Sequence, residues 1–303
     1  MEELLYLLSS DMFLSTLRLS IPLTLAALGA TICERSGIIN LGVEGMMLLG
    51  AFSGVLGVHL SGSPLLGIAL SLAIGALIGL VYALLVLRFD ANQSVSGIGL
   101  NVFASGLTVV LTRAIWNSDG LSGDIRQVSS VTVPGLSEIP LVGLLFKNQS
   151  PYLYLTVALV LLAWWFMYRT KQGLRLRAIG EYPEAASTVG IPVKRYRYRA
   201  IVVCGMLCAL GGSYLSIVQN NRFVKEMVAG RGFMALAANI FGGRDPIGSW
   251  VASLIFAYAQ AVRINISVNI PEQFLQMLPY VLTLLVLVLM GLRNSKKIKD
   301  SVL

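Results

Sequence analysis

Long apolar runs, separated by short polar borders, make up most of this chain. Several of them approach or exceed the roughly 20 residues that a helix needs to cross the hydrocarbon core of a bilayer. The alternation of apolar and polar residues that is typical of membrane β-strands is absent. The pattern therefore predicts an all-α polytopic membrane protein, because a helix satisfies its own backbone hydrogen bonds in lipid.

We predict about nine membrane helices, some of them short or broken. The expected spans are residues 13–32, 36–60, 64–87, 94–115, 151–168, 199–218, 232–243, 247–266 and 272–292. The second span begins with glycines and polar side chains, which predicts an irregular, kinked start. The run 232–243 is too short to cross alone, so we expect a half-length or broken helix there.

Basic residues set the expected orientation of the spans. Lys and Arg near the ends of membrane helices favour the cytosolic side, and they concentrate in the segment 170–198 and at the C-terminus. We therefore place the N-terminus outside, the C-terminus inside, the segment 170–198 in the cytosol and the irregular segment 116–150 outside, with a short helix possible near its end. Residues 1–303 are expected to form one transmembrane domain.

Composition narrows the functional classes. Charged residues make up 13% of the chain and the mean hydropathy is +0.76, whereas a soluble domain carries about 25% charged residues. The net charge of +8 could indicate a nucleic-acid partner, but the basic residues lie at membrane borders, so we expect none. One histidine and three scattered cysteines predict neither a metal site nor a catalytic cluster, and no phosphate-binding GxxxxGK[ST] motif occurs. We expect a non-enzymatic chain.

The charged segment between the fifth and sixth spans reads as one or two short helices on the inner face. Proline and acidic residues suit a first helical turn, and glycine followed by proline ends a helix. Two alanines form a slim face that could enter a groove on another protein, although a plain solvated loop is an equally open interpretation. The candidate docking residues are Gly180, Glu181, Pro183, Glu184, Ala185, Ala186 and Gly190.

Polar side chains at membrane depth are the candidates for a solute path. They are Asn40, Glu44, Asn92, Gln93, Asn101 and Asn239. Each amide could instead hold two helices together, and Glu44 could instead cap a helix N-terminus, where the dipole favours negative charge. A path lined by neutral amides suits a small, uncharged, hydrogen-bonding solute.

Four segments resemble the permeases of ABC importers of the simple-sugar and nucleoside class, whose members are related to ribose and branched-chain amino acid permeases. The segments are residues 34–52, 174–191, 222–248 and 274–284, in the same order as in that family. The resemblance implies transport by alternating access, with residues 180–190 as the element that docks on a separate ABC ATPase. That partner would bind ATP and Mg²⁺, so no cofactor is expected in this chain. A solute-binding protein outside the membrane is also implied.

The segment 34–52 also distinguishes between branches of that family. Asn40 and Glu44 stand where ribose-type permeases typically carry a glycine-aspartate version of the segment, so the chain looks more like the nucleoside branch. That branch implies the shorter of two different, paired permeases in a bacterial cell (inner) membrane, translocating nucleosides. Two alternatives stay open: a permease for a simple sugar such as ribose, and an ion-coupled secondary carrier that would depend on Glu44.

Overall fold

The computed structural model describes residues 10–129 and 148–265, and these residues are almost entirely helical. In chain order the elements are α2 (Ser10–Glu34), α3 (Val43–Ser61), α4 (Pro64–Leu87), α5 (Gln93–Trp116), α6 (Pro151–Arg169), α7 (Lys171–Glu181), α8 (Pro183–Thr188), α9 (Val193–Ser213), the π-helix η2 (Tyr214–Gln219), α10 (Arg231–Phe241) and α11 (Pro246–Asn265). Within the described ranges the β-structure consists of an isolated bridge between Leu121 and Val224. The predicted all-α class is confirmed.

Seven helices in the described part are long and apolar enough to span a membrane, with α9 and η2 counted as one continuous span. They match seven of the predicted spans. The eighth, α10, has 11 residues and is about 16 Å long, well short of a bilayer core of about 30 Å; it is the short helix that the sequence predicts. The expected span 272–292 and the possible short helix near the end of the segment 116–150 lie outside the described residues.

Local sequence signals set the ends of these helices. Pro64 and Pro151 stand in the first turn of α4 and α6, where a missing N–H costs nothing. The side chain of Asn92 accepts hydrogen bonds from the backbone N–H groups of Ser94 and Val95 and so caps α5. Gly62 ends α3 in the left-handed conformation, with φ at 67°.

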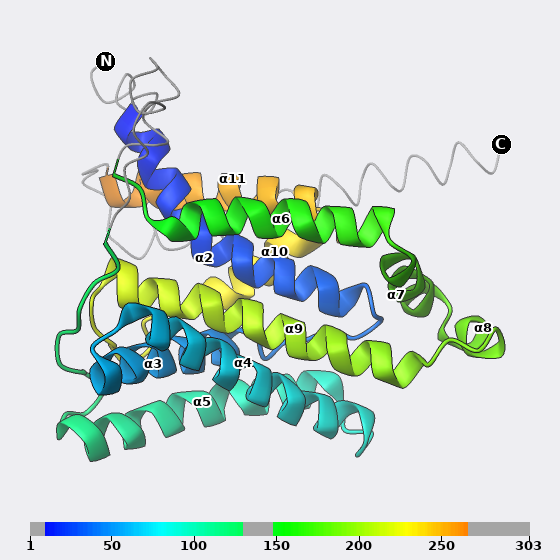
Figure 1. Cartoon of the computed structure of the whole chain (residues 1–303), viewed down its shortest axis with the longest axis horizontal. Coiled ribbons are helices and arrows are strands. Elements are labelled where there is room, and N and C mark those ends of the chain that lie inside the picture. Colours follow the sequence, from blue (N-terminus) through cyan, green and yellow to red (C-terminus); the bar gives the residue numbers. More distant parts are fainter. Residues whose placement is uncertain (1–9, 130–147, 266–303) are drawn as a thin grey trace.

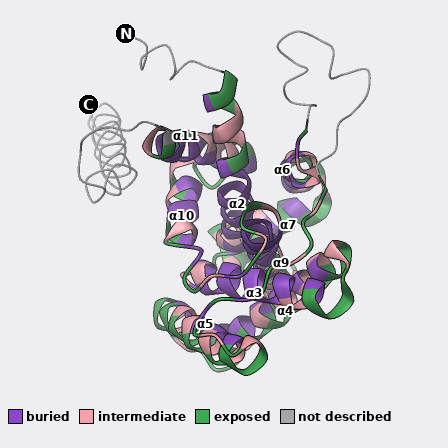
Figure 2. Ribbon diagram, turned by 90° about the vertical axis from the view of Figure 1, so that its left-hand side faces the viewer, coloured by how far each residue is buried: buried purple, intermediate pink, exposed green. Residues whose placement is uncertain are grey.

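Three spans form the centre of the bundle. In the most apolar stretch of each span, 89% of residues are buried in α2 and 78% in both α3 and the α9–η2 span, against 28–39% in α4, α5, α6 and α11. Figure 1 shows the long helices running side by side, and the end-on view in Figure 2 shows buried residues gathered in α2, α3 and α9. The outward faces of α4, α5 and α6 are apolar and exposed, as expected for surfaces in contact with lipid or another chain.

Close backbone approach holds α3, α4 and α9 together. A methyl group added at Gly212 would lie 1.9 Å from the carbonyl oxygen of Met47, and one at Gly50 would lie 2.2 Å from Cα of Ala209. At the same contact the hydroxyl of Ser71 donates to the carbonyl oxygens of Gly50 and Ala209, at 3.0 and 2.9 Å. Small residues permit this spacing, which is the usual basis of helix association in membranes.

The described part of the segment 116–150 pairs with the segment that follows η2. Backbone N–H groups of Ser122 and Ile125 donate to the carbonyl oxygens of Phe223 and Asn221. Phe223 is fully buried and meets the ring of Phe52 edge-on at 5.5 Å. The two connections therefore close the end of the bundle that lies opposite α7 and α8.

Candidate functional site

The predicted docking residues lie on α7 and α8, which project from one end of the bundle (Figure 1). The end of α6 turns directly into α7: the Thr170 hydroxyl accepts a hydrogen bond from the backbone N–H of Gly173 at 3.0 Å. Pro183 begins α8 and Gly190, with φ at +80°, follows it. The sequence signals for one or two short helices are thus matched by two.

The exposed surface of this projection is formed mainly by α8 and its flanks. Glu181, Glu184 and Ala185 are exposed, whereas Ala186 is only 4% exposed and faces the projection's own interior. Neither carboxylate forms an ion pair within the described residues. Two large apolar side chains, Tyr182 and Val189, are 75% and 74% exposed. This is a surface with unpaired charge and uncovered apolar area, which a partner could cover.

The projection contacts the bundle through the turn that connects α2 and α3. A methyl group added at Gly180 would lie 2.4 Å from the carbonyl oxygen of Arg35, so a side chain at this position would clash with backbone. Arg197 of α9 donates from Nε to the carbonyl oxygen of Ser36 at 3.1 Å, and Gly37 has φ at +84°. Displacement of α7 would therefore act directly on the end of α2.

A second contact joins the projection to α11. The Arg177 guanidinium of α7 lies 4.7 Å from the centre of the Tyr168 ring, a cation–π distance. The Tyr168 hydroxyl donates to Asp245 at 2.7 Å, and the other carboxylate oxygen of Asp245 accepts from the N–H groups of Ile247 and Gly248 at the start of α11. Asp245 thus caps α11 while it contacts α6.

This second contact is not evident from the sequence. Asp245 stands directly before Pro246, and an acidic residue followed by proline is a signature of a helix start, so its capping role could have been found. Its partner Tyr168 is 77 residues away, and no periodicity relates two residues at that separation.

Two of the predicted path amides shape the irregular start of the second span. The Asn40 side chain is 2% exposed; its oxygen accepts from the N–H of Gly42 at 2.9 Å. Asn101 of α5 accepts from the N–H of Gly45 and donates to the carbonyl oxygen of Leu41, at 2.8 and 2.9 Å. These bonds satisfy the backbone of a non-helical segment that joins α2 to α3, and the expected irregular start is observed.

Glu44 fixes the position of α10. Its two carboxylate oxygens accept hydrogen bonds from the N–H groups of Gly230 and Gly232, at 2.8 and 2.7 Å. These donors lie at the N-terminus of α10, where the helix dipole favours a negative charge. The helix that Glu44 caps is therefore α10, and not α3, in whose first turn Glu44 stands.

The other three candidate amides lie towards the end that carries α7 and α8. Asn92 caps α5, and the Gln93 side chain accepts from the N–H of Ile39 at 2.9 Å. Asn239 is fully buried, accepts from Thr31 at 2.8 Å and donates to Glu34. The six candidates thus lie in separate groups within one chain, and each side chain is hydrogen-bonded to the protein. A role in the solute path stays a prediction for all six.

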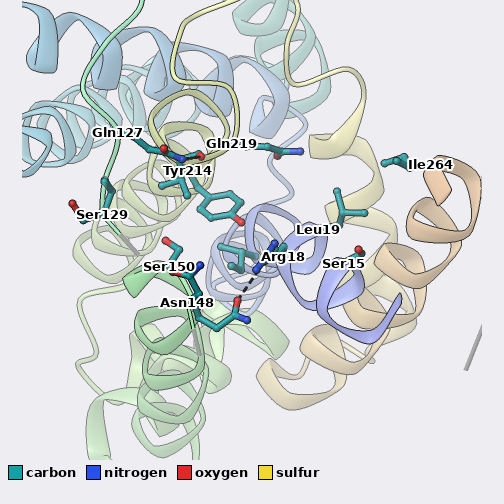
Figure 3. Close-up of a pocket in the computed structure, with 14 residues that line it drawn as sticks. Ser15, Arg18, Leu19, Gln127, Ser129, Asn148, Ser150, Tyr214, Gln219 and Ile264 are labelled. Carbon is teal, nitrogen blue, oxygen red and sulfur yellow. Dashed lines mark hydrogen bonds between the residues drawn. The ribbon is translucent and has the colours of Figure 1, made fainter. Parts of the chain in front are cut away.

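A cavity of about 750 Å³ opens at the end opposite α7 and α8. It is lined by residues 15–21 of α2, the segment 148–150 before α6, residues 127–129, the π-helix η2 and the end of α11. In Figure 3 Arg18 and the Tyr214 ring point toward one another across it. Arg18 donates to the amide of Gln149 at 3.4 Å. Among the described residues, the polar lining of the cavity consists of one cation, several amides and several hydroxyls. The volume is within the range of roughly 300–1,000 Å³ of small-molecule sites.

Known proteins are similar in sequence to most of this chain. The profile of the family described as branched-chain amino acid transport system / permease component matches residues 12–289. The chain is 36% identical to the guanosine ABC transporter permease protein NupQ of Bacillus subtilis, with 90% of this chain and 89% of that protein covered. It is 37% identical to the nucleoside ABC transporter permease protein NupC of Lactococcus lactis, with 89% of each chain covered.

A solved structure supports the fold. A metal-chelate type ABC transporter in an inward-facing conformation matches with a TM-score of 0.50 at 16% identity, covering 94% of this chain and 85% of that one. Together with the seven candidate spans, the relatives establish a multi-pass protein of the cell membrane. The chain therefore belongs to the family described as the branched-chain amino acid transport system / permease component, and it is an ABC transporter permease.

Proposed function

We propose that the chain is the membrane-spanning subunit of an ATP-driven importer of nucleosides. The observation that carries the proposal is similarity over about nine-tenths of the chain to two permeases named for guanosine and nucleosides. The described lining of the cavity around Arg18 and Tyr214 offers hydrogen-bond donors and acceptors, which suit a polar solute. A nucleoside carries hydroxyls and base edges that such groups can bind.

A simple sugar is the second candidate substrate. The protein TsgC13 of Haloferax volcanii, named as a glucose ABC transporter permease, is 34% identical over 83% of this chain, against 36% and 37% for the two nucleoside permeases. The same cavity lining would serve sugar hydroxyls. The lower identity ranks this candidate below nucleosides. An uptake assay in which unlabelled glucose, ribose and guanosine compete separately with a labelled nucleoside distinguishes the two substrate classes.

Residues 180–190 act as the coupling element in this proposal. A separate ABC ATPase, which binds ATP and Mg²⁺, docks on the exposed carboxylates and apolar side chains of α8. Movement of α8 reaches the spans through Gly180, which touches the α2–α3 turn, and through Arg177, which touches Tyr168. ATP binding would shift the permease between inward- and outward-facing states only through contacts that differ between them.

A second, longer permease and an extracytoplasmic solute-binding protein complete the proposed complex. The Bacillus subtilis protein NupP is also named as a guanosine permease; this chain covers 74% of NupP but 89% of NupQ. The chain thus corresponds better to the shorter member of that pair.

Charge reversal on α8 tests the coupling role. Glu184→Lys should lower nucleoside uptake at least about tenfold without loss of expression or of affinity for the solute-binding protein, since Glu184 is exposed and its side chain makes no ion pair in the described chain. The control is Asp119→Lys, which reverses an exposed charge at the opposite end and breaks only a surface pair with Arg113, a change of about 1 kcal/mol or less. Uptake that persists in cells without any ABC ATPase would exclude the proposal.

A further inference from the structure

A cleft of about 540 Å³ lies beside the α4–α5 turn, at the end of the bundle that carries α7 and α8. It is bordered by the last turn of α4, the turn residues 90–92, the first turn of α5 and the first turn of α9. It lies at the opposite end of the bundle from the cavity around Arg18.

Basic side chains outnumber acidic ones in this cleft. Lys194 and Arg197 line it from α9, and Asp90 is the one acidic residue among the described residues that line it. Arg197 is fixed, because its Nε donates to the carbonyl oxygen of Ser36 at 3.1 Å. Within the described residues neither Lys194 nor Arg197 forms an ion pair with Asp90 or with any other carboxylate. The cleft therefore retains positive charge that an anion could neutralise.

Large exposed apolar side chains adjoin the lining residues of the cleft in sequence. Leu85 precedes Val86 of α4, Phe89 precedes Asp90 in the α4–α5 turn, and Val95 follows Ser94 of α5. Because α4 has 24 residues and is about 36 Å long, its last turn lies near the edge of a hydrocarbon core of about 30 Å. A ligand in the cleft would thus have its charged part at the level of the lipid headgroups and an apolar surface beside it.

We propose that this cleft binds the phosphate headgroup of an anionic phospholipid, with Lys194 and Arg197 as its cationic ligands and the acyl chains lying along α4 and α5. Basic pockets between membrane helices on the cytoplasmic side are known to suit such headgroups. A free phosphate ion offers the same charge, but it would gain nothing from the adjoining apolar side chains. Because exposed apolar side chains adjoin the cationic cleft, a phospholipid fits this site better than a free anion does.

The site also has neighbours that matter for coupling. Lys194 and Arg197 border a second cleft on their other side, which Glu184 of α8 lines. Gln93, which lines the lipid cleft, accepts from the N–H of Ile39 in the segment joining α2 to α3. A bound headgroup would therefore share its cations with the coupling element and contact the α2–α3 connection.

Native mass spectrometry of the purified full chain tests the proposal. The probes are phosphatidylglycerol, phosphatidylcholine and inorganic phosphate. Lys194→Gln should weaken phosphatidylglycerol binding about 5-fold, and the Lys194→Gln/Arg197→Gln double variant about 30-fold, from about 1 kcal/mol for each basic residue near an anionic surface. The matched control is Lys171→Gln/Arg175→Gln, which removes two exposed charges from α7 outside the cleft. Because neither residue lines the cleft, this double variant should change phosphatidylglycerol binding by less than about 2-fold.

Three results would overturn the assignment. Equal binding of phosphatidylcholine and phosphatidylglycerol would show that the cleft does not select an anion. Equal losses in the cleft and control double variants would show a diffuse charge effect. Full displacement of phosphatidylglycerol by millimolar-range inorganic phosphate would identify a free anion as the ligand. Since Arg197 also holds Ser36, the single Lys194→Gln variant decides the matter if the double variant does not fold.

Discussion

Replacing Gly212 by alanine would add a methyl group at the closest contact between α3 and α9. That methyl carbon would lie 1.9 Å from the carbonyl oxygen of Met47, and backbone, not a flexible side chain, is what it meets. Contacts below 3.0 Å are not tolerated, so α3 and α9 would have to separate by about 1 Å, and a gap of roughly 0.5–1 Å already forfeits a quarter to a half of each dispersion contact.

The magnitude follows from two opposing effects. Overpacking in a well-packed core costs about 1–3 kcal/mol, and a backbone clash belongs at the upper end of that range. Alanine recovers about 0.5–1 kcal/mol relative to glycine inside a helix. The net loss is about 2 kcal/mol, which lowers Tm by about 4–8 °C. The change in Tm is measured by heating the purified chain in detergent and using size-exclusion chromatography to follow its thermal unfolding.

Gly106→Ala is the matched control. Gly106 lies inside α5 with no atom within 4 Å of the position of the added methyl, so the same substitution should leave Tm unchanged or raise it slightly. If Gly212→Ala were as stable as Gly106→Ala, the close approach of α3 and α9 would not exist and the arrangement of the central helices would be wrong.

Two further substitutions test the contacts at the site. Tyr168→Phe keeps the ring beneath Arg177 but removes the hydroxyl that donates to Asp245. The amount of nucleoside transported per ATP hydrolysed should fall several-fold at normal expression. An unchanged ratio would show that this contact does not take part in coupling. Glu44→Ala leaves the N–H groups of the half-buried Gly230 and the buried Gly232 without their acceptor, and the buried group alone costs about 1–3 kcal/mol. Proteolysis of residues 220–230 should therefore accelerate. An unchanged cleavage rate would show that Glu44 does not hold α10.

Several helix ends were predicted closely, because they depend on local chemistry, although α3 begins at Val43 and α9 at Val193, against predicted starts at 36 and 199. The predicted span 64–87 has the same bounds as α4, and 151–168 ends one residue before α6 does. Both begin at a proline and end near a charged residue. The short helix was also predicted within two residues, since two glycines after Phe241 mark its end.

Tertiary partners were not predictable in the same way. The carboxylate of Glu44 binds N–H groups 186 and 188 residues away, and the sequence gives no signal for that pairing. Similarly, the six polar residues proposed for a path look alike in sequence, but the structure places them in separate groups. The π-helical turn at Tyr214–Gln219 was not anticipated either, because its composition is that of an ordinary apolar helix.

The two anchored ends of α10 limit how this protein can change shape. Glu44 binds its first turn, and near its last turn Asn239 donates to Glu34, which also pairs with Arg244 at 2.8 Å. The 11-residue helix α10 thus connects the first turn of α3 to the last turn of α2. Any rearrangement that alters the distance between Glu34 and Glu44 must break a charged hydrogen bond to α10. The helix α10 therefore acts as a spacer of fixed length between these two carboxylates.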